Sequence, residues 1–98
     1  MDEPMLPERQ KSTYFVYLLQ CADGTLYAGS TTDIERRLEE HNSSKKGAGY
    51  TRSRRPVTLL YSEDCGNQAE AQKREYAIKQ LTRTQKLALI QTAVSSVQ

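Results

Sequence analysis

The chain has 98 residues, and its 14 lysines and arginines stand against 12 aspartates and glutamates, for a net charge of +2. This length fits one domain and leaves no room for a second hydrophobic core. Leucine, isoleucine, valine and phenylalanine together number only 18, but the small net charge argues against disorder and favours a folded domain with a modest core.

No apolar run approaches the length of a membrane span, so we expect neither a signal peptide nor a membrane helix. Cys21 and Cys65 show no CxxC spacing and no histidine at a ligand spacing. This pattern argues against a zinc site and against a disulfide framework. We therefore interpret them as two free thiols in a reducing cytoplasm.

Residues 1–13 are mostly polar, contain two prolines and show no period, so we expect a flexible N-terminal tail. The segment from Tyr14 to Gln20 then alternates in the manner of a strand. One face carries Tyr14, Val16 and Leu18, and the other carries Phe15, Tyr17 and Leu19. Because both faces are largely apolar, this segment is expected to be a central strand covered on both sides.

A hairpin and a helix are predicted next. Asp23-Gly24 is a strong turn signal, since glycine accepts the positive φ that a tight hairpin requires. Thr25 to Gly29 is the expected returning strand. The pattern Thr32-x-x-Glu35 is a capping box that predicts the start of a helix.

In that helix Ile34 and Leu38 are four residues apart and are expected to face the core. Arg37 and His41, the only histidine, are also four apart and share a face beside that stripe. They could look into a cleft at the sheet, or they could be ordinary surface groups. The spacing alone leaves both interpretations open.

Charge is unevenly distributed along the chain. Residues 1–42 carry four basic and eight acidic groups, whereas residues 43–98 carry ten and four. The densest basic stretch lies in the long loop expected over residues 42–56, where a set of cations suits a phosphate backbone. These cations are Lys45, Lys46, Arg52, Arg54 and Arg55. The alternative is a solvated surface with no ligand.

The third strand is predicted over Val57 to Tyr61, with Val57, Leu59 and Tyr61 on one side. Asn67-x-x-Glu70 then caps a helix over residues 67–81.

The apolar stripe of that helix is Ala71, Ile78 and Leu81, and Glu75 lies on or beside it. An inward carboxylate is costly unless it is paired, hydrated or bound to a cation. A pair between Glu75 and Lys79 along the helix is the alternative to a ligand role.

Thr82-x-x-Gln85 caps a last helix. Its apolar residues at helical spacing are expected to close the core; they are Leu87, Ile90, Val94 and Val97. We expect the folded domain to span residues 14–92 and the helix end, residues 93–98, to fray.

Five positions together carry a family resemblance. Phe15-Val16-Tyr17 is followed ten residues later by Tyr27-Ala28-Gly29, then by Arg37 and His41 in a helix, and by Glu75 in a later helix. This series resembles the GIY-YIG nuclease module, and above all the small stand-alone bacterial proteins that consist of little else. The resemblance covers nearly the whole chain and implies a small α+β fold, in which a three-stranded antiparallel sheet is flanked by helices.

The resemblance also implies a chemistry, the hydrolysis of DNA phosphodiester bonds with one divalent cation, Mg²⁺ or Mn²⁺. By position, Tyr17 and Tyr27 would lie near the attacking water, Arg37 would face the phosphate and Glu75 would hold the metal. His41 matches a position where the family uses His or Tyr. Because tyrosine is a poor base at pH 7 and histidine a better one, we expect a tyrosine–histidine group to accept the proton and leave its internal division open.

The chain departs from the family pattern at two places. Position 30 is serine, where many active members place lysine, and no asparagine follows Glu75 where several members use one. The interpretations are a structure-selective, possibly repair-related endonuclease, a nucleic-acid-binding module of the same fold with weak or no catalysis, and a protein-interaction domain. DNA is the expected partner, with RNA as the alternative, and neither a membrane nor a small-molecule cofactor is expected.

Overall fold

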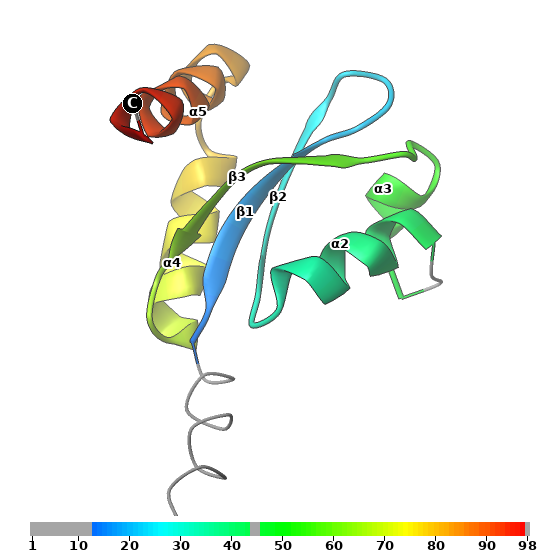
Figure 1. The fold of residues 1–98 in the computed structure, drawn as a ribbon, viewed down its shortest axis with the longest axis horizontal. Coiled ribbons are helices and arrows are strands. Elements are labelled where there is room, and N and C mark those ends of the chain that lie inside the picture. The colour runs from blue at the N-terminus through cyan, green and yellow to red at the C-terminus, as the bar shows by residue number, and fades with distance from the viewer. Residues whose placement is uncertain (1–12, 44–45, 98) are drawn as a thin grey trace, which may run out of the picture.

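The computed structural model describes residues 13–43 and 46–97 of the chain, and it shows an α+β domain (Figure 1). The antiparallel sheet has the order β2-β1-β3, so the first strand is central as its two apolar faces predict. The strands are β1 (Phe15–Gln20), β2 (Leu26–Thr31) and β3 (Thr58–Asp64). The helices within the described ranges are α2 (Ile34–Ser43), α3 (Gly49–Arg52), α4 (Gln68–Lys79) and α5 (Arg83–Val97).

The turn between β1 and β2 forms as the sequence predicts. Gly24 has a φ of +88°, a conformation that glycine adopts without steric cost. The Asp23 carboxylate accepts hydrogen bonds from the backbone N–H and the hydroxyl of Thr25, at 3.1 and 2.7 Å. These contacts fix the hairpin register, in which Tyr17 lies opposite Gly29.

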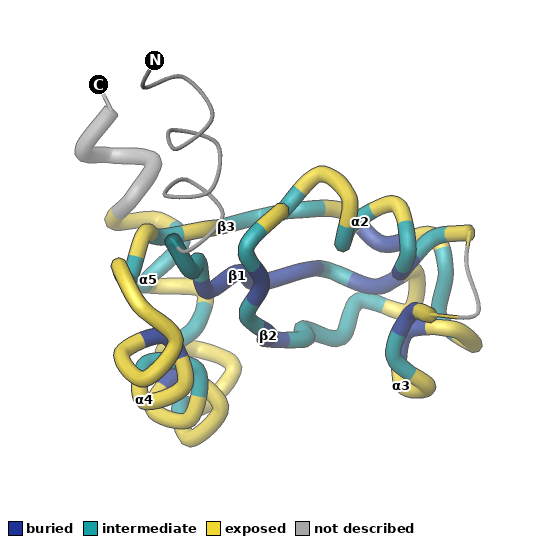
Figure 2. Tube along the Cα trace, turned by 90° about the horizontal axis from the view of Figure 1, so that it is seen from below, coloured by how far each residue is buried: buried dark blue, intermediate teal, exposed yellow. Residues whose placement is uncertain are grey.

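Each face of the sheet has its own core, and a different pair of helices covers it (Figures 1 and 2). On the α4 and α5 side the buried residues are Val16, Leu18, Ala28, Ala71 and Ile78. On the α2 and α3 side they are Tyr17, Leu19, Cys21 and Val57, with Tyr27 and Leu38 packed against them. The predicted alternation of β1 and the predicted inward positions of Leu38, Ala71 and Ile78 are thereby confirmed.

A β-bulge makes β3 differ from its prediction. The pairing with β1 shifts between Leu18 and Leu19, so that Leu60 is an extra residue on β3. As a result Leu59 packs on the α2 side and Tyr61 packs on the α4 side. The prediction that Val57, Leu59 and Tyr61 share one side is therefore wrong at Tyr61. The strand also extends past its predicted end, to Asp64.

The helix caps follow the sequence with one correction. Asp33, not Thr32, caps α2, because its carboxylate accepts the Arg36 N–H at 3.1 Å. Asn67 accepts the Glu70 N–H at 2.9 Å. At α5 the predicted capping box forms. The Thr82 hydroxyl accepts from the Gln85 backbone N–H, and the Gln85 side chain accepts from the Thr82 backbone N–H.

Helix α5 closes the core with other residues than expected. Ile90 packs on the α4-side core as predicted, and Leu89 joins it. Leu87 is 41% exposed, so its predicted core position is wrong; the helix rests on the core along the side that carries Leu89 and Ile90. The side chains of Val94 and Val97, residues 1–12 of the expected tail, and Lys45 lie outside the described part of the chain.

Among the described residues, no helix is both long enough and apolar enough to cross a membrane.

Candidate active site

Tyr17 and Gly29 form the floor of the site where β1 and β2 pair. Tyr17 is only 3% exposed, and its ring lies across Gly29 on the neighbouring strand. A Cβ at position 29 would come within 2.5 Å of the Tyr17 Oη and 2.7 Å of its Cζ. Position 29 must therefore be glycine for the tyrosine to occupy this place.

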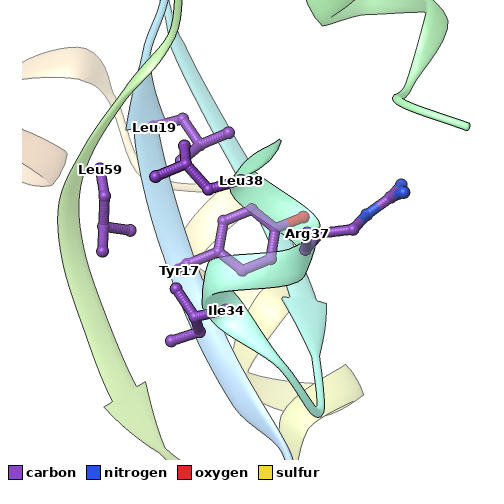
Figure 3. A pocket seen from close by; sticks show the side chains of 6 residues that line it. All are labelled: Tyr17, Leu19, Ile34, Arg37, Leu38 and Leu59. Atoms are coloured by element: carbon purple, nitrogen blue, oxygen red, sulfur yellow. The ribbon is translucent and has the colours of Figure 1, made fainter. Parts of the chain in front are cut away.

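The Tyr17 ring lines a small, mostly apolar pocket (Figure 3). Ile34 and Leu38 of α2 line it from one side, and Leu19 and Leu59 line it from the sheet, while the hydroxyl lies on the side of Arg37. This packing fixes the ring and leaves its oxygen to polar partners. Burial is the main reason that the pKa of Tyr17 rises to about 12, against the opposing effect of the nearby Arg37.

His41 lies fully buried on α2, where its ring joins the sheet to the short helix α3. Its Nε2 is 3.0 Å from the Tyr17 hydroxyl, and its Nδ1 is 2.8 Å from the Thr51 hydroxyl. Burial, and then the charge of Arg37, lower the pKa of His41 to about 4. The surface alternative for His41 is wrong, and at neutral pH the imidazole is uncharged.

Tyr27 approaches His41 from β2. The two ring centroids are 5.4 Å apart in an edge-on arrangement. Tyr27 also stacks on Tyr50 of α3, with ring centroids 5.7 Å apart and an angle of 20° between the ring planes. The Arg54 guanidinium lies 4.0 Å from the Tyr50 centroid, so an aromatic and cationic stack leads outward from His41.

Arg37 borders the site one turn before His41. Its guanidinium donates to the Glu40 carboxylate at 2.9 Å and to the Lys46 carbonyl at 2.8 Å. It also lies close enough to the Tyr17 hydroxyl for its charge to lower the pKa of Tyr17. Arg37 thus places a permanent positive charge beside the hydroxyl, and it has the planar fork that suits a phosphate.

Glu75 reaches the same region from α4, at the β2 edge of the sheet. Its Oε1 accepts a hydrogen bond from Ser30 of β2 at 2.9 Å, and its Oε2 lies 2.8 Å from Lys79 Nζ. Its negative charge adds to the effect of burial in raising the pKa of Tyr17. The helical pair with Lys79 does form, and Ser30 also holds the carboxylate at the β2 edge of the sheet.

The cations of residues 46–55 differ in how far they are exposed. Arg55 donates to the backbone carbonyls of Glu40 and His41, and so it fastens the C-terminal end of α2. Arg54 donates to Asp23 at 3.1 Å and to the Tyr50 carbonyl at 2.8 Å. Arg52 and Lys46 lie exposed. Arg54 and Arg55 therefore have structural partners as well as the phosphate role predicted for them.

Three residues of the site were missed by reasoning from the sequence. Thr51 and Tyr50 fall in a segment without periodicity, which gave no sign that α3 packs on His41. Ser30 was noted as a departure from the family pattern, but its contact with Glu75 spans 45 positions of sequence and has no local signal.

Glu75 can serve as the single carboxylate ligand of a magnesium ion that keeps most of its water ligands. The described residues contain no group of three or more His, Cys, Asp or Glu side chains that could hold a metal. Magnesium needs only one or two carboxylates, however. Glu75 opens onto a groove of about 260 Å³ that it lines with Gln72, Tyr76 and Lys79. The Lys79 ammonium already stands at the carboxylate as a cation would.

Known proteins are similar to this chain in sequence. A UPF0213 protein of Desulfotalea psychrophila is 61% identical over 87 residues, which make up 89% of this chain and 79% of that protein. Another, of Halobacterium salinarum, is 54% identical over 76 residues, or 78% of this chain and 97% of that protein.

Two solution NMR structures are also similar. A UPF0213 protein of Bacillus halodurans superposes with a TM-score of 0.53 at 41% identity, and a protein of E. faecalis does so with 0.57 at 44%. Each match covers 82% of this chain and 84% of the other. The family model of the GIY-YIG catalytic domain matches residues 13–88 of this chain. Because this match spans most of the chain, the chain belongs to the GIY-YIG catalytic domain family of nucleases.

Proposed function

We propose that the chain is a metal-dependent endonuclease that hydrolyses DNA phosphodiester bonds and acts in repair on branched, nicked or distorted DNA. The observation that carries this proposal is the 3.0 Å contact between the Tyr17 hydroxyl and His41 Nε2, beside the charge of Arg37. Arginine and tyrosine at such a site contact phosphate rather than base edges, so the proposal includes selectivity for DNA shape over sequence.

Tyr17 and His41 act together as the proton acceptor in this proposal. A free Tyr17 phenolate is costly because its pKa is about 12. Passing the Tyr17 proton to His41 avoids the formation of a free phenolate. The attacking water gives a proton to the Tyr17 oxygen while the Tyr17 proton passes to His41 Nε2. The water oxygen bonds to phosphorus, one P–O ester bond breaks, and the leaving oxygen takes a proton from solvent.

Arg37 stabilises the charge that develops during this step. Negative charge grows on the phosphoryl oxygens, and a fixed guanidinium next to them lowers the barrier. Its contacts with Glu40 and the Lys46 carbonyl hold it in place before the substrate arrives. A divalent cation on Glu75 would supply Lewis-acid stabilisation of the phosphate.

The proposal is tested with labelled duplex, single-stranded and branched DNA in the presence of Mg²⁺. We expect Tyr17→Phe and Glu75→Gln each to slow cleavage by about 10²-fold or more. Tyr61→Phe and Glu70→Gln are matched controls, because they make the same chemical changes on the far face of the sheet and on an exposed turn of α4. Cleavage that survives both site variants would show that the activity lies elsewhere.

A nucleic-acid-binding module without turnover is the second candidate. It is favoured by the occupation of both Glu75 carboxylate oxygens, one by Ser30 and one by Lys79. Binding then falls with rising salt as phosphate contacts release counterions, and Arg52→Ala reduces the salt slope by about 1. Steep salt dependence with no cleavage of any of the three DNA forms would select this candidate, while a flat salt response would contradict both.

A further inference from the structure

A chain of hydrogen bonds continues behind His41, away from the tyrosine. The Thr51 hydroxyl lies 2.8 Å from His41 Nδ1, and it donates to the Ala48 carbonyl at 3.0 Å. Thr51 and His41 are both fully buried, so water does not replace these contacts. The series therefore runs from Tyr17 through His41 and Thr51 to a backbone carbonyl.

The direction of each bond in this series follows from the donors available. Thr51 has one hydroxyl proton, and it is used on the Ala48 carbonyl. The Thr51 oxygen must then accept from His41, which puts the ring proton on Nδ1. At the other end Nε2 of the same uncharged ring can only accept, and it lies 3.0 Å from the Tyr17 hydroxyl. The Tyr17 proton therefore points at His41 Nε2.

The neighbours of His41 thus determine which ring nitrogen donates a hydrogen bond and which one accepts. An imidazole whose pKa is lowered to about 4 by burial carries one proton at neutral pH. A neutral imidazole has one donor and one acceptor, and the two sites must differ. The opposite tautomer would point an N–H of His41 at the Tyr17 oxygen and leave the buried Tyr17 hydroxyl proton without its acceptor.

We propose that Thr51 is a positioning residue that fixes His41 in the Nδ1–H tautomer, so that Nε2 accepts the proton of Tyr17. Helix α3 owes its place on His41 to this contact and to the stack of Tyr50 on Tyr27. The tautomer itself needs no substrate. Its consequence for cleavage rests on the function proposed above, in which a protonated Nε2 could not take up the tyrosine proton.

The experiment uses the fact that the chain has a single histidine. Full-length protein with ¹⁵N-labelled histidine gives one pair of imidazole nitrogens, and long-range ¹H–¹⁵N correlations show which of them is protonated. In the wild type at neutral pH we expect the proton on Nδ1. A proton on Nε2 would overturn the proposal without any variant.

Three variants ask which neighbour sets the tautomer. Thr51→Ser keeps the hydroxyl and is expected to keep Nδ1–H. Tyr17→Phe removes the other partner and is also expected to keep Nδ1–H. Thr51→Val keeps the branched shape without the acceptor, and we expect it to lose the pure Nδ1–H state. Loss of that state in Tyr17→Phe, or its retention in a folded Thr51→Val, would overturn the proposal.

A kinetic measurement separates this proposal from the proposed function. In an active enzyme Thr51→Val lowers kcat by about 10²-fold with little change in KM, and Thr51→Ser restores it. If the wild type cleaves no DNA, the proposed function fails while the tautomer is still decided by the nitrogen signals. If the wild type cleaves DNA and Thr51→Val cleaves it equally well, the positioning role fails alone.

Discussion

At the scale of single residues, Gly29 is a position with little freedom. In Gly29→Ala the new Cβ would meet the hydroxyl end of the buried Tyr17 ring at 2.5 Å. We expect the ring to move, the contact with His41 to break, and the free energy of unfolding to fall by about 1–3 kcal/mol. Urea denaturation measures the loss, and Gly49→Ala is the control because the nearest atom to its Cβ is 4.0 Å away. Equal stability of the two variants would contradict the close packing.

Lys79 competes with a divalent cation for Glu75. Its ammonium is 2.8 Å from the carboxylate, and that contact raises the pKa of Lys79. In Lys79→Met the competing charge is removed, and a partly exposed pair of this kind is worth up to about 1 kcal/mol, which is roughly fivefold in affinity. We therefore expect tighter Mn²⁺ binding, measured by the loss of the free Mn²⁺ signal in electron paramagnetic resonance.

The matched control for that variant is Lys73→Met. It removes the same charge from the same helix, but Lys73 pairs with the exposed Glu70 at 3.6 Å instead. Its Mn²⁺ affinity is expected to equal that of the wild type. If both variants bind the ion alike, the effect is one of net charge and Glu75 is not the anchor.

At the scale of elements, α3 holds the buried side of the site in place. Its four residues are too few for helical periodicity to predict it, so the sequence suggested a loop there. Tyr50 fastens it to β2 by stacking on Tyr27. We expect Tyr50→Ala to lower the free energy of unfolding by about 0.5–1.5 kcal/mol, as urea denaturation would show. Tyr76→Ala, on an exposed turn of α4, is expected to cost much less.

The sequence predicted most elements because their signals are local. Alternation in β1, the Asp23-Gly24 turn and the caps at Asn67 and Thr82 each lie within a few residues, and each is present in the structure. The bulge at Leu60 was not predictable, because it is a property of the pairing between β1 and β3. The same holds for Thr51 and Ser30, whose partners are brought to them by packing across the sheet.

At the scale of the whole molecule, two helical layers meet at one strand edge. Tyr17, Tyr27 and His41 belong to the α2 side, and Glu75 lies on α4, which packs on the other core. Figure 2 shows α2 and α4 apart, with the strands between them. Strand β2 separates them, and the bond from Ser30 to Glu75 passes at its edge. The site therefore depends on the complete fold, since neither layer carries all of its groups.

The free energy of unfolding of the whole molecule depends on the protonation of one buried group, His41. His41 has a pKa of about 4 in the folded chain and an ordinary value of 6.5 when unfolded. The unfolded state therefore binds the proton first as pH falls below 6.5, and stability is lost between that pH and about 4. From about pH 7.5 to about pH 5.5 we expect the free energy of unfolding to fall by about 1 kcal/mol.

Among the described residues, the carboxylates with lowered pKa values do not produce a loss in this window. The carboxylates of Asp23, Glu40 and Glu63 have lowered pKa values, so their contribution persists until the pH is more acidic. His41→Gln is therefore expected to show a nearly flat stability over the same two pH values, measured by urea denaturation. A slope in that variant equal to the wild type would place the titrating group elsewhere. A flat wild type would mean that the imidazole is not held neutral between Tyr17 and Thr51.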